Sequence, residues 1–110
     1  MGKNYRRIKI KETEYLQIGY KPELFESVHN EQRIRINKTA VDPKPAITKY
    51  WKPKGDLGGQ QHHVYVEPFL EFARYIPNKY QLIHFTFQPT EYELKKAKEL
   101  LTEDGKIIMQ

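Results

Sequence analysis

The chain has 110 residues, 38% of them hydrophobic and 13% aromatic, which is enough for one modest core and argues against disorder over its whole length. It has no cysteine, so disulfides and thiolate metal sites are excluded, and no apolar run approaches the length of about 20 residues that spans a bilayer. The formal net charge is +5, and residues 1–54 hold thirteen Lys and Arg against six Asp and Glu, whereas residues 55–110 hold six against eight. We therefore expect a single intracellular, cytoplasmic domain over residues 1–110, without membrane association, whose first half builds a cationic surface.

Two stretches of the first half alternate isoleucine with cationic residues. They are Arg7-Ile8-Lys9-Ile10-Lys11 and Arg33-Ile34-Arg35-Ile36-Asn37-Lys38. A period of two is typical of a β-strand, so the sequence predicts strands over residues 5–11 and 32–38 with isoleucines on one face and arginines and lysines on the other.

The other elements of the first half are shorter. A strand is expected over residues 15–19, and Pro22 begins a short helix over residues 22–29. Pro43 and Pro45 cannot donate ladder hydrogen bonds, which predicts a loop or a sheet edge around residues 42–46. Residues 46–51 are expected to form a strand, and the glycine-rich residues 52–62 a flexible loop.

The second half alternates strands with helices. Strands are expected over residues 63–67, 81–88 and 106–109, with a helix from Pro68 to Ile76 between the first two. Thr90 and Glu93 predict a capping box for a last helix, which Gly105 ends. The order indicates an α+β fold: a mixed or antiparallel sheet of about five strands, with two main helices on one face and a bare cationic face on the other.

A bare cationic face suits phosphate oxygens, and the segment Lys49-Tyr50-Trp51-Lys52-Pro53-Lys54 adds aromatic residues that can stack on unpaired bases. We expect a nucleic-acid-binding protein that favours single-stranded targets, because no helix has a basic face that could enter a duplex groove. The expected phosphate contacts are Arg7, Lys9, Arg33, Arg35 and Lys38; the stacking residues are Tyr50 and Trp51; Lys49, Lys52 and Lys54 assist. No cofactor or metal is expected.

Two alternatives stay open. The same cations suit the acidic surface of a protein partner, so the chain could be an interaction module or an inhibitor. Alternatively, Ile83-His84-Phe85-Thr86-Phe87 resembles one half of the signature of the two-histidine phosphoesterases, which implies a small phosphodiesterase or nuclease using His84. The second half of that signature is absent, because His63-Val64-Tyr65 has tyrosine where threonine or serine is expected. Convergence of His62, His63, Glu67 and His84 would be needed for an acid/base or metal site.

Overall fold

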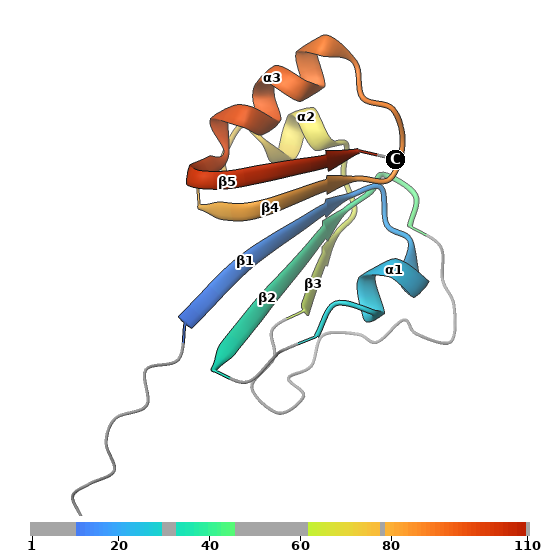
Figure 1. The fold of residues 1–110 in the computed structure, drawn as a ribbon. Coiled ribbons are helices and arrows are strands. Elements are labelled where there is room, and N and C mark those ends of the chain that lie inside the picture. The colour runs from blue at the N-terminus through green and yellow to red at the C-terminus, as the bar shows by residue number, and fades with distance from the viewer. Residues whose placement is uncertain (1–10, 30–32, 46–61, 78, 110) are drawn as a thin grey trace, which may run out of the picture.

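The computed structural model describes residues 11–29, 33–45, 62–77 and 79–109. These residues form five strands and three short helices (Figure 1). In chain order they are β1 (Lys11–Ile18), α1 (Pro22–Glu26), β2 (Ile34–Val41), β3 (His62–Tyr65), α2 (Phe69–Phe72), β4 (Tyr80–Phe85), α3 (Glu91–Glu99) and β5 (Leu101–Met109). The strands predicted over residues 46–51 and most of 5–11, and most of the predicted loop 52–62, lie outside the described residues.

The five strands form one sheet in the order β3-β2-β1-β4-β5, and every neighbouring pair is parallel. The prediction of a mixed or antiparallel α+β sheet with two main helices on one face is therefore wrong. Parallel neighbours need a crossover that returns the chain to the same edge, and α1, α2 and α3 lie in three of these crossovers. The alternation of strand and helix in the second half was the signal for this arrangement, and the first half contains the same unit with a helix of only five residues.

The helices lie on both faces of the sheet (Figure 1). The α1 face holds a core cluster of Tyr15, Tyr20, Phe25 and Ala40, against which Ile36 packs. The α2/α3 face holds the larger cluster, which includes Leu16, Phe72, Ile83, Phe85 and Leu100. The chain moves from β1 to β2 to β3 in one direction across the sheet, and then from β4 to β5 in the opposite direction. The helices change face at the same point, from α1 on one face to α2 and α3 on the other, so the crossovers have the same handedness.

Strand β1 is central, and its carboxyl half is buried on both faces. Tyr15, Leu16 and Ile18 are each at most 2% exposed, and the polar residue between them, Gln17, is fully buried. Burial of Gln17 is tolerated because its side chain is paired at both ends: Oε1 accepts from the Lys21 backbone N–H at 2.8 Å and Nε2 donates to the Tyr15 hydroxyl at 3.1 Å. A polar residue at this position therefore does not mark a solvent-facing side of the strand.

Helix α3 begins as predicted and ends earlier. The capping box is present: Thr90 Oγ1 accepts from Glu93 N at 3.1 Å, and Glu93 Oε1 accepts from Thr90 N at 2.9 Å. The prediction that Gly105 ends this helix is wrong, because the helix ends at Glu99 and Gly105 lies inside β5. A Cβ on Gly105 would lie 2.9 Å from the Tyr80 carbonyl oxygen, so glycine is required here for close approach of β4 and β5.

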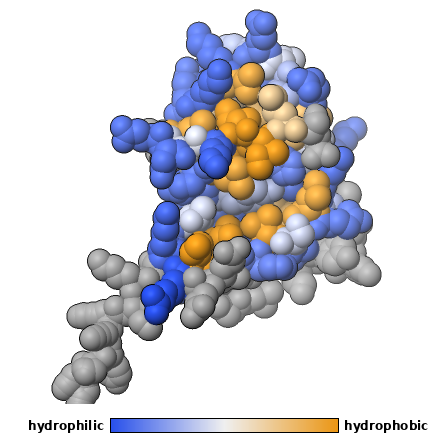
Figure 2. Space-filling model, in the orientation of Figure 1, coloured by the Kyte–Doolittle hydropathy of each residue, from blue (hydrophilic) through white to orange (hydrophobic). Residues whose placement is uncertain are grey.

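Strand β5 is the edge of the sheet beside β4, and apolar side chains lie exposed on it. Ile108 and Met109 are each 46% exposed. Figure 2 shows hydrophobic surface gathered in the upper half of the view, where Figure 1 draws β4 and β5. This edge therefore exposes apolar side chains beside the charged residues Glu103, Asp104 and Lys106. Among the described residues, no helix is both long and apolar enough to cross a membrane.

Candidate nucleic-acid interface

Three of the predicted phosphate ligands lie in the described part of the chain, at or in β2. Arg33 directly precedes the strand and is exposed, with a positive φ of 66°. Its carbonyl oxygen accepts a hydrogen bond from Lys11 N at 2.9 Å, so the exposed cations Lys11 and Arg33 are neighbours where β1 and β2 begin. Arg35 and Lys38 are not available in the same way.

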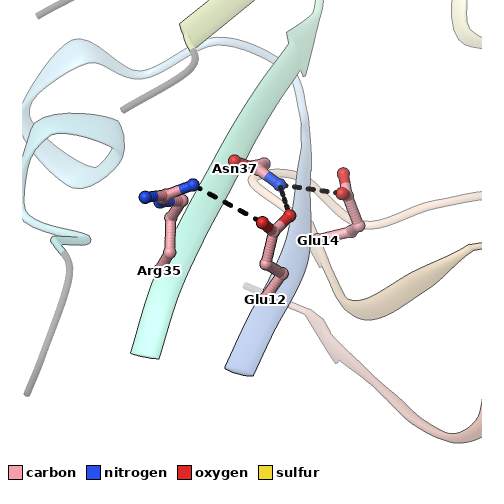
Figure 3. A network of polar contacts seen from close by, with 4 residues as sticks. All are labelled: Glu12, Glu14, Arg35 and Asn37. Atoms are coloured by element: carbon pink, nitrogen blue, oxygen red, sulfur yellow. Dashed lines mark hydrogen bonds and ion pairs between the residues drawn. The ribbon is translucent and has the colours of Figure 1, made fainter. Parts of the chain in front are cut away.

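Arg35 belongs to a network of polar side chains across β1 and β2, in which Asn37 joins two glutamates (Figure 3). Arg35 Nη1 lies 3.5 Å from Glu12 Oε2, and Asn37 Nδ2 donates to Glu12 Oε1 at 3.3 Å and to Glu14 Oε2 at 2.9 Å. On the other side, Lys79 Nζ lies 3.7 Å from Glu14 Oε1. The predicted bare cationic face is therefore a surface of mixed charge, because the strand register places Glu12 beside Arg35 and Glu14 beside Asn37.

Lys38 lies on the face of the isoleucines, not of the arginines, because Ile34, Ile36 and Lys38 occupy every second position of the strand. It is 2% exposed, and its Nζ donates to the carbonyl oxygen of Phe25 at 2.8 Å and lies 4.9 Å from the centre of the Phe25 ring. Burial lowers the pKa of the Lys38 ammonium, and the charge of Glu26 opposes this effect in part. Lys38 thus anchors α1 to the sheet and cannot reach a phosphate in this conformation.

The charge of the described residues is balanced. They contain twelve Lys and Arg and twelve Asp and Glu, so the excess of five positive charges belongs to the rest of the sequence. Residues 1–10 contain four cations and no carboxylate, and residues 46–61 contain three cations and one carboxylate. The other predicted ligands lie in these two segments, outside the described residues: Arg7, Lys9, Lys49, Tyr50, Trp51, Lys52 and Lys54.

The two basic segments join the sheet at known places. Residues 1–10 lead into Lys11 at the amino end of β1, beside Arg33. Residues 46–61 follow Pro45, beyond the carboxyl end of β2, and lead into the amino end of β3. Because β3, β2 and β1 are adjacent and parallel, both segments join the same half of the sheet.

The histidines and Glu67 do not form one site. His63 is in β3 and His84 in β4, and β2 and β1 lie between these strands, a separation of about 14 Å across the sheet. The His84 ring is instead hydrogen-bonded within the sheet, with Nδ1 3.1 Å from the Tyr15 hydroxyl. Glu67 accepts a hydrogen bond from the Tyr75 hydroxyl. Among the described residues, no three His, Cys, Asp or Glu side chains are grouped as metal ligands would be.

The likeness to the two-histidine phosphoesterases is not supported by the position of Thr86. Its hydroxyl donates to the carbonyl oxygens of Ile18 at 3.2 Å and Gly19 at 2.9 Å, beyond the carboxyl ends of β1 and β4. Thr86 is 7% exposed, so it serves to join two strand ends rather than to bind a substrate beside His84.

These strand ends are where sequence reasoning missed a feature. β1 and β4 are the neighbours from which the chain proceeds in opposite directions across the sheet, and ligands of parallel α/β sheets commonly bind beyond the carboxyl ends of such strands. Gly19 occupies this point with φ of 88°, and a Cβ there would meet Thr86 Oγ1 at 2.3 Å and the Phe87 ring at 3.1 Å. A single glycine directly after a buried strand was the only signal in the sequence.

The loop after β1 does not form a phosphate cradle. It contains one glycine, Pro22 removes a backbone donor at the start of α1, and α1 has only five residues. Asp42, which follows β2, is also occupied: Oδ2 accepts from Tyr20 N at 2.8 Å and Oδ1 from Lys44 N at 2.7 Å. A buried dinucleotide site of the usual doubly wound kind is therefore not built here.

No protein-family model, curated protein or solved structure matches this chain.

Proposed function

We propose that this protein binds nucleic acid, with single-stranded targets favoured, through its basic segments and the exposed cations beside them. The observation that carries the proposal is the separation of charge along the sequence. Residues 1–10 and 46–61 together hold seven Lys and Arg and one Asp, whereas all other residues hold twelve Lys and Arg and thirteen Asp and Glu. Surface charge without a function is usually spread over a domain, whereas a polyanion is bound by clustered cations.

The second support is the place where the segments join the sheet. Lys11 and Arg33 are exposed and adjacent at the amino end of β1, which continues directly from residues 1–10. Residues 46–61 also contain Tyr50 and Trp51 among lysines, the combination that holds phosphates and stacks on bases. Lys38 is left out of the proposal because it is buried, and Arg35 contributes little because Glu12 neutralises it.

The test is a fluorescence-anisotropy titration of labelled single-stranded RNA, single-stranded DNA and duplex DNA at several salt concentrations. If five phosphates are neutralised, the logarithm of affinity for a single strand falls against the logarithm of salt with a slope of about −3 to −4. The variant Arg7→Gln/Lys9→Gln/Lys11→Gln loses three of these contacts, so its slope is smaller in magnitude by about 2.

A matched control removes the same charge elsewhere. Lys95→Gln/Lys96→Gln/Lys98→Gln also removes three positive charges, but from α3, where Glu91, Glu93 and Glu99 balance them. Its slope should equal that of the unaltered protein. Equal losses in both triple variants would show a response to net charge alone and would contradict the proposal. Absence of binding to all three nucleic acids at low salt would favour the alternative partner, an acidic protein surface.

A further inference from the structure

The carboxyl edge of the sheet presents exposed cations and an exposed aromatic ring on neighbouring strands. Lys44, Lys21 and Phe87 follow β2, β1 and β4, which are adjacent in the sheet. Both lysines are exposed, and Phe87 is 39% exposed. Because all three strands are parallel, the three residues lie at one edge, at and beside the point where the chain's direction across the sheet reverses.

Phe87 is held in place although it is exposed. The absence of a side chain at Gly19 lets the Phe87 ring lie against the backbone, since a Cβ there would be 3.1 Å from Cδ1 and 3.2 Å from Cε1. The Phe85 ring packs edge-on against the Phe87 ring, with 5.7 Å between the ring centres and 82° between the ring planes. Thr86, the residue before Phe87, is fixed by the hydrogen bond from its hydroxyl to the Gly19 carbonyl oxygen after β1. An aromatic ring fixed in this way loses little conformational freedom when a second ring stacks on it.

The two lysines are carried by loops that are joined to each other. The Asp42 carboxylate accepts from Tyr20 N with one oxygen and from Lys44 N with the other, while Gln17 Oε1 accepts from Lys21 N. Both oxygens of Asp42 are therefore hydrogen-bonded to backbone N–H groups. Within the part of the chain that the structure describes, no carboxylate forms an ion pair with Lys21 or Lys44. Among the described residues, neither charge is therefore neutralised by an ion pair.

We infer that this edge is a nucleotide-binding platform for a single strand, in which a base stacks on Phe87 and Lys21 and Lys44 contact the adjoining phosphates. The inference rests on the proposed function and adds the location of a base contact. An aromatic ring with two cations beside it fits a nucleobase-bearing anion better than an acidic peptide, because a peptide carboxylate would use the lysines and leave the ring without a partner.

The experiment compares two probes: a labelled oligodeoxynucleotide of about 12 nucleotides and an abasic strand of the same length. Phe87→Leu keeps an apolar residue but removes the stacking ring. It should weaken binding of the base-containing strand about fivefold to a hundredfold and leave the abasic strand unchanged. Phe87→Tyr should bind both as the unaltered protein does. Lys21→Gln/Lys44→Gln should weaken binding of both probes.

Tyr75→Leu is the control, because Tyr75 is also an exposed aromatic residue, with 57% of its surface accessible. Its hydroxyl is hydrogen-bonded to Glu67, which follows β3, and β3 lies three places from β4 in the sheet. It should change neither affinity. Binding of the base-containing strand that is the same in Phe87→Leu and the unaltered protein would overturn the platform while leaving the proposed function intact. Failure of the unaltered protein to bind either probe would overturn both. Thermal unfolding of each variant checks folding, and if Phe87→Leu fails to fold, an unchanged affinity of the double lysine variant would overturn the platform instead.

Discussion

At the scale of single residues, Lys38 shows how the cost of burying a charge decides what a cation does. Its ammonium is held by one carbonyl oxygen and by the face of the Phe25 ring, with the carboxylate of Glu26 in the same region. These contacts replace hydration only in part, which is why burial lowers its pKa. The residue binds α1 to β2 and has no path to an external phosphate.

The lowered pKa has a definite consequence for stability. Between the folded pKa of Lys38 and its ordinary value of 10.5, the unfolded chain binds more protons, so the free energy of unfolding rises with pH in this window. Lys38→Met removes the charge, and we expect it to raise the free energy of unfolding by about 1 kcal/mol at pH 7. The gain should shrink as pH approaches 10.5.

Chemical denaturation at several pH values measures this effect, with the exposed Lys44→Met as control. Lys44→Met should leave the free energy of unfolding at pH 7 close to that of the unaltered protein, because its side chain is exposed. A less stable Lys38→Met at pH 7 would mean that the hydrogen bond to Phe25 and the ring contact outweigh desolvation.

At the scale of elements, the junction between the ends of β1 and β4 depends on Gly19. Gly19→Ala introduces a Cβ 2.3 Å from Thr86 Oγ1 at a φ of 88°, a backbone conformation that favours glycine. We expect a loss of about 1–3 kcal/mol in the free energy of unfolding.

A double-mutant cycle separates the two causes. Thr86→Ala removes the clashing oxygen, so Gly19→Ala/Thr86→Ala should lose less stability than the sum of the two single variants, with strain from φ remaining. Strict additivity in denaturation experiments would show that the contact with Thr86 is relieved without cost.

Elements differ in how far the sequence predicts them. The capping box of Thr90 and Glu93 is a local interaction, and it was predicted correctly. The end of α3 was predicted wrongly, because Gly105 does not end the helix. It allows β5 to approach the carbonyl oxygen of Tyr80 in β4, which is distant in the sequence. Likewise, the period of two correctly separates Ile36 from Arg35, but the partner of Arg35 is Glu12, and only the pairing of β1 with β2 brings them together. Local patterns were readable and the neighbours of each strand were not, whereas the strand-helix alternation that indicates parallel strands was present in the sequence and was interpreted wrongly.

At the scale of the whole molecule, stability should be concentrated in the central strand. Leu16 is fully buried in the α2/α3 cluster, so Leu16→Ala is expected to lower the free energy of unfolding by about 2–5 kcal/mol. Ile108→Ala, in the edge strand and at a residue 46% exposed, should cost well under half as much. Urea denaturation of both variants makes the comparison, and equal losses would contradict the placement of β1 at the centre.

The order of the strands also governs when the core can form. Tyr15 in β1 pairs with Leu82 in β4, 67 positions later. One of the two hydrogen-bonding edges of β1 therefore stays unpaired until most of the chain is available. Until then, Leu16 and Ile18 lack the helices and the strand that cover them. Pairings so distant in sequence carry a large loop-closure cost before they gain contacts, which slows folding. During synthesis, a nascent chain that ends before β4 therefore carries an open strand edge with an apolar surface, the form in which this protein is most prone to aggregate and to need a chaperone.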